Sequence, residues 1–408
     1  MLVPSVLVGI AGGATVPVSV LAALELGASP ALASLVIALV GLATLATTVL
    51  AGRFIDRLGD RRAMLVATAA AAGCTALSVG ALAWGGSGAL ALFVVSLVLR
   101  APVMNVWNLS RQALVAEHVP VERRGRAMTA LGGTMRAGTL LGPLLGAALL
   151  LQLPLWSVYV LSVGCALLAL GVLYTPAGST LDTAARAARS DGHGSGATAD
   201  GSQGTRSRTP APGPTTVRWR AVLLAGVAVG TLALARVAQP VVLQLWGVSL
   251  GFSESTISLL VALGAAVELV LMFPGGRLKD TLGRSPVLVL CLAVYGAGFV
   301  LLAGLPSLVG AVVAVLVMAV GNGLGAGINM TIGADLSPAV DRARFLGTWA
   351  LFSAAGSLAG PATVSALVAV GSARLALLGI AAVALAGSAW MAGWARVAAL
   401  PGGVGRGR

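Results

Sequence analysis

Long apolar runs separated by short polar stretches make up most of this chain. Twelve runs of roughly 20 residues lack the strict alternation of β-strands, so they predict helices long enough to cross a lipid bilayer. The predicted helices cover residues 2–24, 31–51, 63–84, 89–115, 127–151, 155–174, 221–246, 255–274, 286–305, 308–332, 345–370 and 375–394. We expect the first to be a span and not a signal peptide, because it lacks a basic leader and has a counterpart in the second half.

One polar stretch is much longer than the others. Residues 176–216 are rich in Ser, Thr, Gly, Ala and Pro, and this composition buries too little apolar surface to fold, so it predicts a flexible linker. The linker separates two blocks of six helices. We therefore predict a six-helix half over residues 1–175, a linker over 176–220, a second six-helix half over 221–395 and a tail over 396–408.

A charged stretch after the second helix recurs after the eighth. GRFIDRLGDRR runs from Gly52 to Arg62, and GRLKDTLGR runs from Gly276 to Arg284. One fixed offset aligns Gly52 with Gly276, Asp56 with Asp280, Gly59 with Gly283, Gly27 with Gly251 and Ser29 with Ser253. The pattern predicts that a hairpin of two helices occurs twice, each time with a short charged loop at its turn.

Composition identifies the solvent as lipid. Hydrophobic residues make up 58% of the 408 residues and charged residues only 10%, whereas a soluble domain has about a quarter charged residues. Structures that satisfy their backbone inside a bilayer are helices or closed barrels, and the long runs favour helices. The 55 glycines fit membrane helices that pack through small residues. Cys74, Cys165 and Cys291 lie inside apolar runs, so we expect neither a disulfide framework nor a metal site.

The net charge of +13 is concentrated in alternate polar stretches. Both charged repeats, the stretch from Val121 to Arg126, the linker and the stretch from Asp335 to Arg344 carry the basic residues. The intervening stretches hold Glu25, Glu254 and the single basic residue Arg374. By the positive-inside rule, the basic stretches and both termini face the cytoplasm from the cell (inner) membrane. The positive charge therefore indicates orientation and not nucleic-acid binding.

Two further patterns accompany the repeat. Arg100 lies inside the fourth helix, and the fifth helix has the pattern G-x-x-x-G-P-x-x-G. This pattern comprises Gly138, Gly142, Pro143 and Gly146, and a weaker version in the eleventh helix comprises Gly356, Gly360 and Pro361. Together with the two six-helix halves, the linker and the charged repeat, these residues resemble the major facilitator superfamily, and the fifth helix resembles its drug:proton antiporter branches. The resemblance covers the chain except the linker and tail.

The resemblance implies a fold and a gating device. The fold is an all-α membrane protein with twelve transmembrane helices in two pseudo-symmetric six-helix bundles, and the charged repeats act as latches between conformations. The implied gating residues are Gly52, Asp56, Arg57, Gly59, Gly276, Asp280, Gly283 and Arg284, with Gly138, Gly142 and Pro143 as a flexible packing seam. Two positions depart from the family pattern. Asp60 stands where a basic residue is usual, and Thr281 replaces a common arginine.

Few ionisable side chains lie inside the apolar runs: Arg100, Arg111, Arg136, Arg236 and Glu268. Each costs about 3 kcal/mol or more at the middle of a bilayer, so each should face the interior or a water-filled cavity. The resemblance implies that helices 1, 4, 7 and 10 line a central cavity. The substrate-binding candidates are Arg100, Trp107, Asn108, Arg236, Gln239, Gln244, Asn322 and Asn329. For the asparagines, hydrogen bonding between helices is the alternative role.

Glu268 is the carboxylate placed well inside a predicted span. Burial favours the neutral form of a carboxylate, as a proton carrier requires, whereas a nearby arginine favours the charged form. The sequence therefore leaves two interpretations open. Glu268 either couples transport to protons or forms a structural pair with an arginine.

These features predict a secondary transporter that works by alternating access, with proton-coupled efflux of small organic molecules or drugs as the leading hypothesis. The alternative is uptake or export of a small anionic metabolite, since the arginines in the spans outnumber Glu268. No Walker loop, HExxH, GxSxG or cysteine–histidine pattern occurs, so we expect neither an enzyme nor a cofactor. The expected partners are a small-molecule substrate, protons and the lipid bilayer, and we expect a monomer.

Overall fold

The computed structural model describes residues 2–118, 121–174, 217–338 and 342–400, so most of the predicted linker and tail lies outside the described residues. The first part contains α1 (Leu2–Thr15), the 3-10 turn η1 (Val16–Val18), α2 (Ser19–Glu25), α3 (Pro30–Leu58), α4 (Asp60–Trp84), α5 (Ala89–His118), α6 (Val121–Leu149) and α7 (Trp156–Tyr174). The second contains α9 (Trp219–Ser249), α10 (Glu254–Leu282), α11 (Arg284–Gly304), α12 (Leu308–Leu324), α13 (Ile328–Leu336), α14 (Arg342–Val370) and α15 (Ala373–Ala398).

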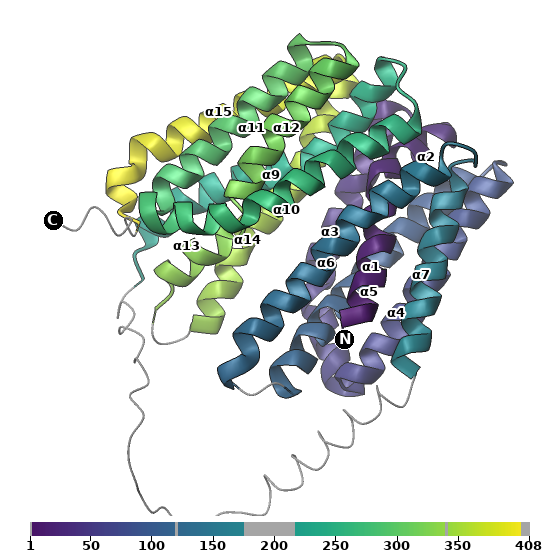
Figure 1. Ribbon diagram of the computed structural model, residues 1–408, viewed down its shortest axis with the longest axis horizontal. Coiled ribbons are helices and arrows are strands. Elements are labelled where there is room, and N and C mark those ends of the chain that lie inside the picture. The colour runs from purple at the N-terminus through teal and green to yellow at the C-terminus, as the bar shows by residue number, and fades with distance from the viewer. Residues whose placement is uncertain (1, 119–120, 175–216, 339–341, 401–408) are drawn as a thin grey trace, which may run out of the picture.

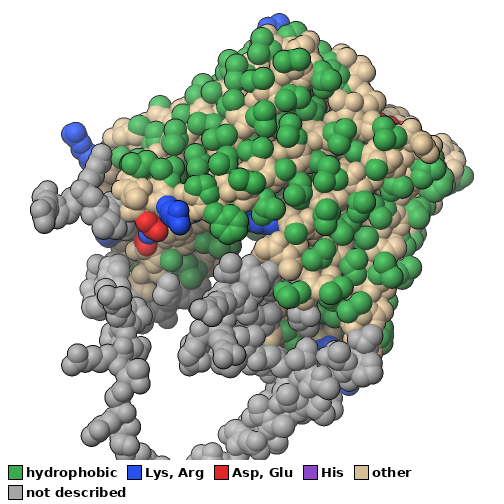
Figure 2. Space-filling view, viewed as in Figure 1, with side chains coloured by type: hydrophobic (Ala, Val, Ile, Leu, Met, Phe, Trp, Pro, Cys, Tyr) green, Lys and Arg blue, Asp and Glu red, His purple; other side chains and the backbone are tan. Residues whose placement is uncertain are grey.

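These helices form two groups of six spans, α1–α7 and α9–α15, which lie side by side in Figure 1. Among the described residues, eleven spans are long and apolar enough to cross a membrane. The twelfth span is α6, whose first turns contain Arg123, Arg124 and Arg126. Hydrophobic side chains cover most of the face shown in Figure 2, as expected of a surface in contact with lipid. The predicted fold class, an all-α membrane protein with two six-helix bundles, is confirmed.

The charged stretches are helical, contrary to the prediction of loops. α3 continues to Leu58 and α4 begins at Asp60, so Gly59 alone makes the turn, with φ at 80°. Gly283 does the same between α10 and α11, with φ at 91°. A glycine with positive φ reverses the chain within one residue, and Arg, Lys and Leu are good helix formers. Gly52 and Gly276 therefore lie inside helices and do not end them, and the basic stretch 121–126 likewise begins α6.

The sequence repeat is also a repeat of local geometry. The hydroxyl of Ser29 accepts a hydrogen bond from the Leu32 amide at the start of α3, and the hydroxyl of Ser253 accepts one from the Thr256 amide at the start of α10, both at 3.2 Å. Each serine is the N-cap that satisfies an orphan amide of its helix. The two hairpins therefore begin and turn by the same devices.

Two spans predicted as continuous helices are broken. α1 ends at Thr15, and a 3-10 turn containing Pro17 precedes α2. α12 ends at Leu324, and Gly327, with φ at 77°, precedes α13. Proline lacks an amide donor and glycine is a weak helix former, so each break falls where the sequence favours it. Both breaks free backbone carbonyls. The first lies where η1 contacts α9 and α10 of the other half, and the second lies beside Lys279 of its own half.

Glycine stripes bring pairs of helices into backbone contact. A Cβ atom at Gly142 of α6 would lie 2.5 Å from the carbonyl oxygen of Ile10 in α1, and one at Gly360 of α14 would lie 2.6 Å from the carbonyl oxygen of Leu234 in α9. Such close approach requires residues without side chains. The same device therefore packs α6 on α1 in one half and α14 on α9 in the other, and α6 then presents its opposite face to α10.

The two halves meet through α3 with α14 and through α6 with α10. The polar contacts between the halves lie in two places. Arg136 binds Glu268 at mid-helix, and further hydrogen bonds lie toward the end opposite the single-glycine junctions. There the Ser365 hydroxyl donates to the carbonyl of Ala31 at 2.8 Å. We call the end at Gly59 and Gly283 the linker end. The linker ends of the two halves point apart in Figure 1, and the described contacts join the halves toward the opposite end.

Candidate functional site

Glu268 lies midway along α10, and both of its carboxylate oxygens accept hydrogen bonds. Arg136 Nη1, from α6 of the other half, donates to Oε1 at 3.1 Å. Asn322 Nδ2, from the last turn of α12, donates to Oε2 at 2.5 Å. The side chains of Arg136 and Glu268 keep 37% and 26% of their surface exposed, so water can reach the pair. A partly exposed carboxylate thus lies where three helices and both halves meet.

Two glycines that the sequence analysis did not select allow this approach. A Cβ at Gly323 would lie 2.6 Å from Cβ of Leu271, and a Cβ at Gly275 would lie 2.8 Å from the carbonyl oxygen of Gly323. α10 and α12 therefore touch through their backbones beside Glu268, which places Asn322 within reach of the carboxylate. The signal in the sequence was the glycine-rich run from Gly321 to Gly327.

A small cavity opens beside the carboxylate. It has a volume of about 150 Å³, and its lining includes Gln239, Glu268 and Asn322 together with Val16 of the other half. Tyr295 donates a hydrogen bond to Oε1 of Gln239 at 3.0 Å, and Arg236 Nη2 donates to the backbone carbonyl of Asn322 at 3.4 Å. Of the predicted substrate residues, the structure therefore brings Arg236, Gln239 and Asn322 together around Glu268. Tyr295 was missed, although a tyrosine inside an apolar run is itself a signal.

The first half has its own polar pocket, of about 240 Å³. Its lining includes Thr44, Arg100, Asn105 and Asn108. Arg100 Nη1 donates to the hydroxyl of Thr15 at 3.3 Å, while its Nε is buried without a hydrogen-bond partner. Within the described part of the chain, no acidic side chain forms an ion pair with Arg100 or with Arg236. Neither guanidinium group is therefore directly paired with a carboxylate among the described residues.

Three predicted substrate residues lie elsewhere. Trp107 is fully buried in the core of the first half, with the guanidinium of Arg111 4.9 Å from its ring centroid. Gln244 is buried between the halves and lines neither of these two pockets. Asn329 accepts a hydrogen bond from Trp349 Nε1 at 2.7 Å, beyond the break that separates it from Asn322. All three were predicted to face the cavity because they share a helix face with other polar residues. Neighbouring helices bury Trp107 and Gln244, and the break after α12 turns Asn329 toward Trp349.

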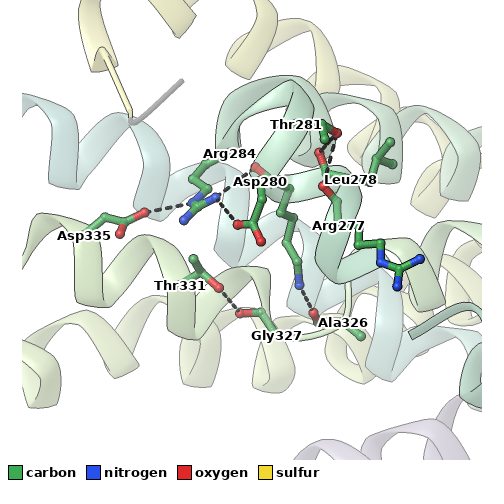
Figure 3. Close-up of polar contacts among 10 residues, drawn as sticks. Arg277, Leu278, Asp280, Thr281, Arg284, Ala326, Gly327, Thr331 and Asp335 are labelled. Atoms are coloured by element: carbon green, nitrogen blue, oxygen red, sulfur yellow. Dashed lines mark hydrogen bonds and ion pairs between the residues drawn. The ribbon is translucent and has the colours of Figure 1, made fainter. Parts of the chain in front are cut away.

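The second charged stretch forms ion pairs at the linker end. Arg284 Nη1 lies 3.1 Å from Oδ1 of Asp280, and its Nε lies 3.0 Å from Oδ2 of Asp335 (Figure 3). Asp280 is 69% exposed, so its pair contributes little stability, whereas Arg284 and Asp335 are mostly buried. Lys279, which was not selected from the sequence, donates a hydrogen bond to the carbonyl of Ala326.

The first charged stretch has different contacts. Asp56 and Arg57 are exposed, and neither side chain forms an ion pair or a hydrogen bond within the part that the structure describes. Arg61 Nη2 donates to the carbonyl of Leu173 at the end of α7, at 3.2 Å. The position that corresponds to Arg284 is occupied by Asp60, so the first copy has a carboxylate where the second has the guanidinium that binds Asp280 and Asp335. The two copies share a fold but differ in charge at this position.

A family model described as Major Facilitator Superfamily matches residues 2–237 and 224–404 of the chain. None of the curated proteins compared with it matches its sequence.

Solved transporters have the same fold. A peptide transporter POT in complex with sulfate is 14% identical, with a TM-score of 0.73 over 97% of this chain and 94% of that chain. A D-xylose–proton symporter is 15% identical, with a TM-score of 0.66 over 96% and 95% of the two chains. The xylose transporter XylE from E. coli, in an inward-open conformation, is 14% identical, with a TM-score of 0.69 over 99% and 97%. At these identities the likeness concerns the fold alone.

Proposed function

As a member of the major facilitator superfamily, this chain is a membrane transporter and not an enzyme, and we propose that it exports small organic molecules by proton-coupled alternating access. In this proposal Glu268 binds the proton. The pockets beside Glu268 and Arg100 bind the substrate, and the cytoplasm lies at the linker end.

The ion pair between Arg136 and Glu268 carries the proposal. It joins α6 of one half to α10 of the other at mid-helix, and its carboxylate has only neutral Asn322 as its second donor. A proton on Glu268 removes the negative charge that holds Arg136 and so weakens the contact between the halves. Proton binding and the separation of the halves are then one event, as coupled transport requires.

The direction of transport rests on the fifth-helix pattern. Gly138, Gly142 and Pro143 resemble the drug:proton antiporter branches, and two of them lie at the backbone contact between α6 and α1. α6 also contains Arg136, so the helix with this pattern holds half of the proposed coupling pair. A solved neighbour is named a proton symporter, and this supports proton coupling in the fold while leaving the direction to the resemblance.

Transport of a small anionic metabolite is the second candidate. Arg100 and Arg236 each have a buried Nε without a hydrogen-bond partner in the described structure, and neither has an acidic partner there. A guanidinium in a low-dielectric pocket is a strong site for a carboxylate or phosphate. This candidate changes the substrate and keeps Glu268 as the proton site.

We expect Glu268→Gln to abolish transport driven by a pH gradient in proteoliposomes and to retain substrate exchange at equal pH, because the amide cannot release a proton. The substrate panel contains a cationic dye and a small carboxylate. Glu254→Gln, at the start of the same helix, is the matched control and should respond to the gradient as the wild type does. Gradient-driven transport by Glu268→Gln at the wild-type rate contradicts the assignment.

The same panel separates the two substrates. If the carboxylate is transported, Arg100→Gln should reduce that transport at least tenfold, about 1.4 kcal/mol, because the anion loses its charged donor. Undiminished carboxylate transport by Arg100→Gln and Arg236→Gln contradicts the anionic candidate.

A further inference from the structure

The short helix α13 is held at both ends by the second charged stretch (Figure 3). Just before its first turn, Lys279 Nζ donates to the carbonyl of Ala326. At its last turn, Arg284 Nε binds Asp335. Arg284 Nη1 also donates to the carbonyl of Lys279 at 2.8 Å, which joins the two holding residues. Two adjacent turns of one stretch therefore fix both ends of one nine-residue helix.

The hold at Ala326 depends on the break. In a continuous helix this carbonyl would accept from the amide four residues later, but the positive φ of Gly327 turns the chain and the ladder restarts at Thr331, whose amide donates to Gly327. The ammonium of Lys279, a residue only 8% exposed, takes the place of that amide. A cation is favourable at the C-terminal end of α12, where the helix dipole is negative.

The same break lies beside Glu268. Asn322, in the last turn of α12, donates to the Glu268 carboxylate, and its own carbonyl accepts from Arg236. Glu268 and Lys279 are three turns apart on α10 and so lie on one face. α10 thus grips the end of α12 at two points, Asn322 and Ala326.

The first half lacks this arrangement. Ile55 occupies the position that corresponds to Lys279, and α5 runs unbroken from Ala89 to His118. A hydrophobic residue cannot satisfy a freed carbonyl, and α5 continues as one helix through Pro102. The break and its cation therefore occur together in the half that contains Glu268.

We propose that Lys279 is a positioning residue for Glu268. By holding the Ala326 carbonyl it fixes the end of α12 so that Asn322 reaches the carboxylate, and through Arg284 it joins that site to Asp335 at the linker end. Loss of the Asn322–Glu268 contact then loosens α13, and release of α13 withdraws Asn322. The role of Glu268 as the proton site is the proposed function on which the consequence for transport rests.

Amide hydrogen exchange of the purified full-length protein, without substrate or gradient, tests this link. We expect Lys279→Met to speed exchange over residues 325–331 at least tenfold, about 1.4 kcal/mol, because a hydrogen bond to a charged donor is lost. Arg277→Met removes an exposed cation two residues earlier on the same helix and should leave that exchange unchanged. Equal exchange in Lys279→Met and Arg277→Met overturns the proposal.

A double-mutant comparison separates positioning from general stability. Glu268→Gln should speed exchange over residues 325–331 in the wild-type and Arg277→Met backgrounds but add nothing in Lys279→Met, where Asn322 has already withdrawn. Additive effects overturn the proposal. Lys279→Ala, which also lacks a donor for the Ala326 carbonyl, replaces Lys279→Met if that variant does not fold, and the same non-additivity is expected. The exchange measurement uses no proton gradient. If Glu268→Gln showed that Glu268 is not the proton site, the exchange data would still test the positioning role of Lys279.

Discussion

Gln244 is a buried amide that uses its polar atoms to join the two halves. Its Oε1 accepts from the Val20 amide at 3.0 Å, and its Nε2 donates to the carbonyls of Val16 and Pro240 at 3.0 and 2.8 Å. The Val16 and Val20 groups lie at the 3-10 break in the first span. One side chain therefore satisfies backbone groups freed by the break and joins the two halves toward the end opposite the linker end.

Gln244→Leu should open that end. The substitution leaves the Val16 and Val20 groups without these partners, at a cost of about 1–3 kcal/mol to the closed state. Spin labels on Leu32 and Val248, both exposed near that end, should report a longer distance distribution by pulsed electron resonance. Gln239→Leu, which removes a hydrogen bond within the second half, is the control. An unchanged Leu32–Val248 distance in Gln244→Leu would refute this role.

At this scale the sequence predicts which residues carry polar chemistry better than it predicts their partners. The bilayer makes any ionisable group conspicuous, so Arg100, Arg236 and Glu268 were selected from the sequence. The partner of Glu268 is Arg136 of the other half, 132 residues away, and helix periodicity does not report contacts between helices. Trp107 and Gln244 share faces with Arg100 and Arg236 but are buried by neighbouring helices.

At the scale of elements, each half contains one helix pair in backbone contact, α1 with α6 and α9 with α14. Gly9 and Gly13 of α1 face Gly138 and Thr139 of α6, so small residues lie on both sides of the contact. Because α6 and α14 also contact the opposite half, each pair joins the interface between the halves to its own bundle.

Gly142→Ala should destabilise the protein. The added Cβ would lie 2.5 Å from the carbonyl oxygen of Ile10, and a backbone contact cannot relax as a side chain can. Overpacking of this kind costs about 1–3 kcal/mol, which should lower the Tm in a thermal scan in detergent. Gly12→Ala has no heavy atom within 4 Å of the new Cβ and should leave the Tm unchanged or raise it. Equal melting of the two variants would argue against a tight α1–α6 contact.

The sequence predicts where spans lie more reliably than where helices end. An apolar run indicates which residues lie inside the bilayer. The helix α3 continues beyond its apolar run, through Gly52 and Asp56 to Leu58, because charged residues can also form helix outside the bilayer. Likewise, an apolar run continues through Pro17 and Gly327, where the backbone breaks. Hydropathy carries no information about backbone φ, and a single glycine with positive φ makes the turn of each hairpin.

For the whole molecule, the basic residues predict orientation. Arg53, Arg57, Arg277 and Arg284 all lie at the linker end, at the two single-glycine junctions. The positive-inside rule predicts that this end faces the cytoplasm, and on that prediction the described contacts between the halves lie toward the outer side of the membrane. The fold, the count of spans and the repeat were predictable because lipid imposes them over the whole chain. The two pockets were not, since they depend on contacts between helices.

Membrane-impermeant maleimide labelling tests the orientation. After replacement of the native cysteines, Arg277→Cys at the linker end should be labelled in inverted vesicles and protected in right-side-out cells. Leu151→Cys is the control for the opposite end, where Leu151 is 71% exposed, and should show the reverse pattern. Labelling of Arg277→Cys from outside intact cells would show that the topology is the reverse of the predicted one.

Under the proposed function, the pairing of Arg136 with Glu268 also predicts a site that is sensitive to membrane voltage. When Glu268 is ionised, the pair has no net charge, so the transmembrane field exerts almost no net force on it. A bound proton leaves the charge of Arg136 uncompensated at mid-helix, where moving a full elementary charge across the bilayer is worth about 2.3 kcal/mol per 100 mV. If Glu268 binds the proton as proposed, the electrical part of the proton-motive force acts on the protonated site in addition to the difference in pH.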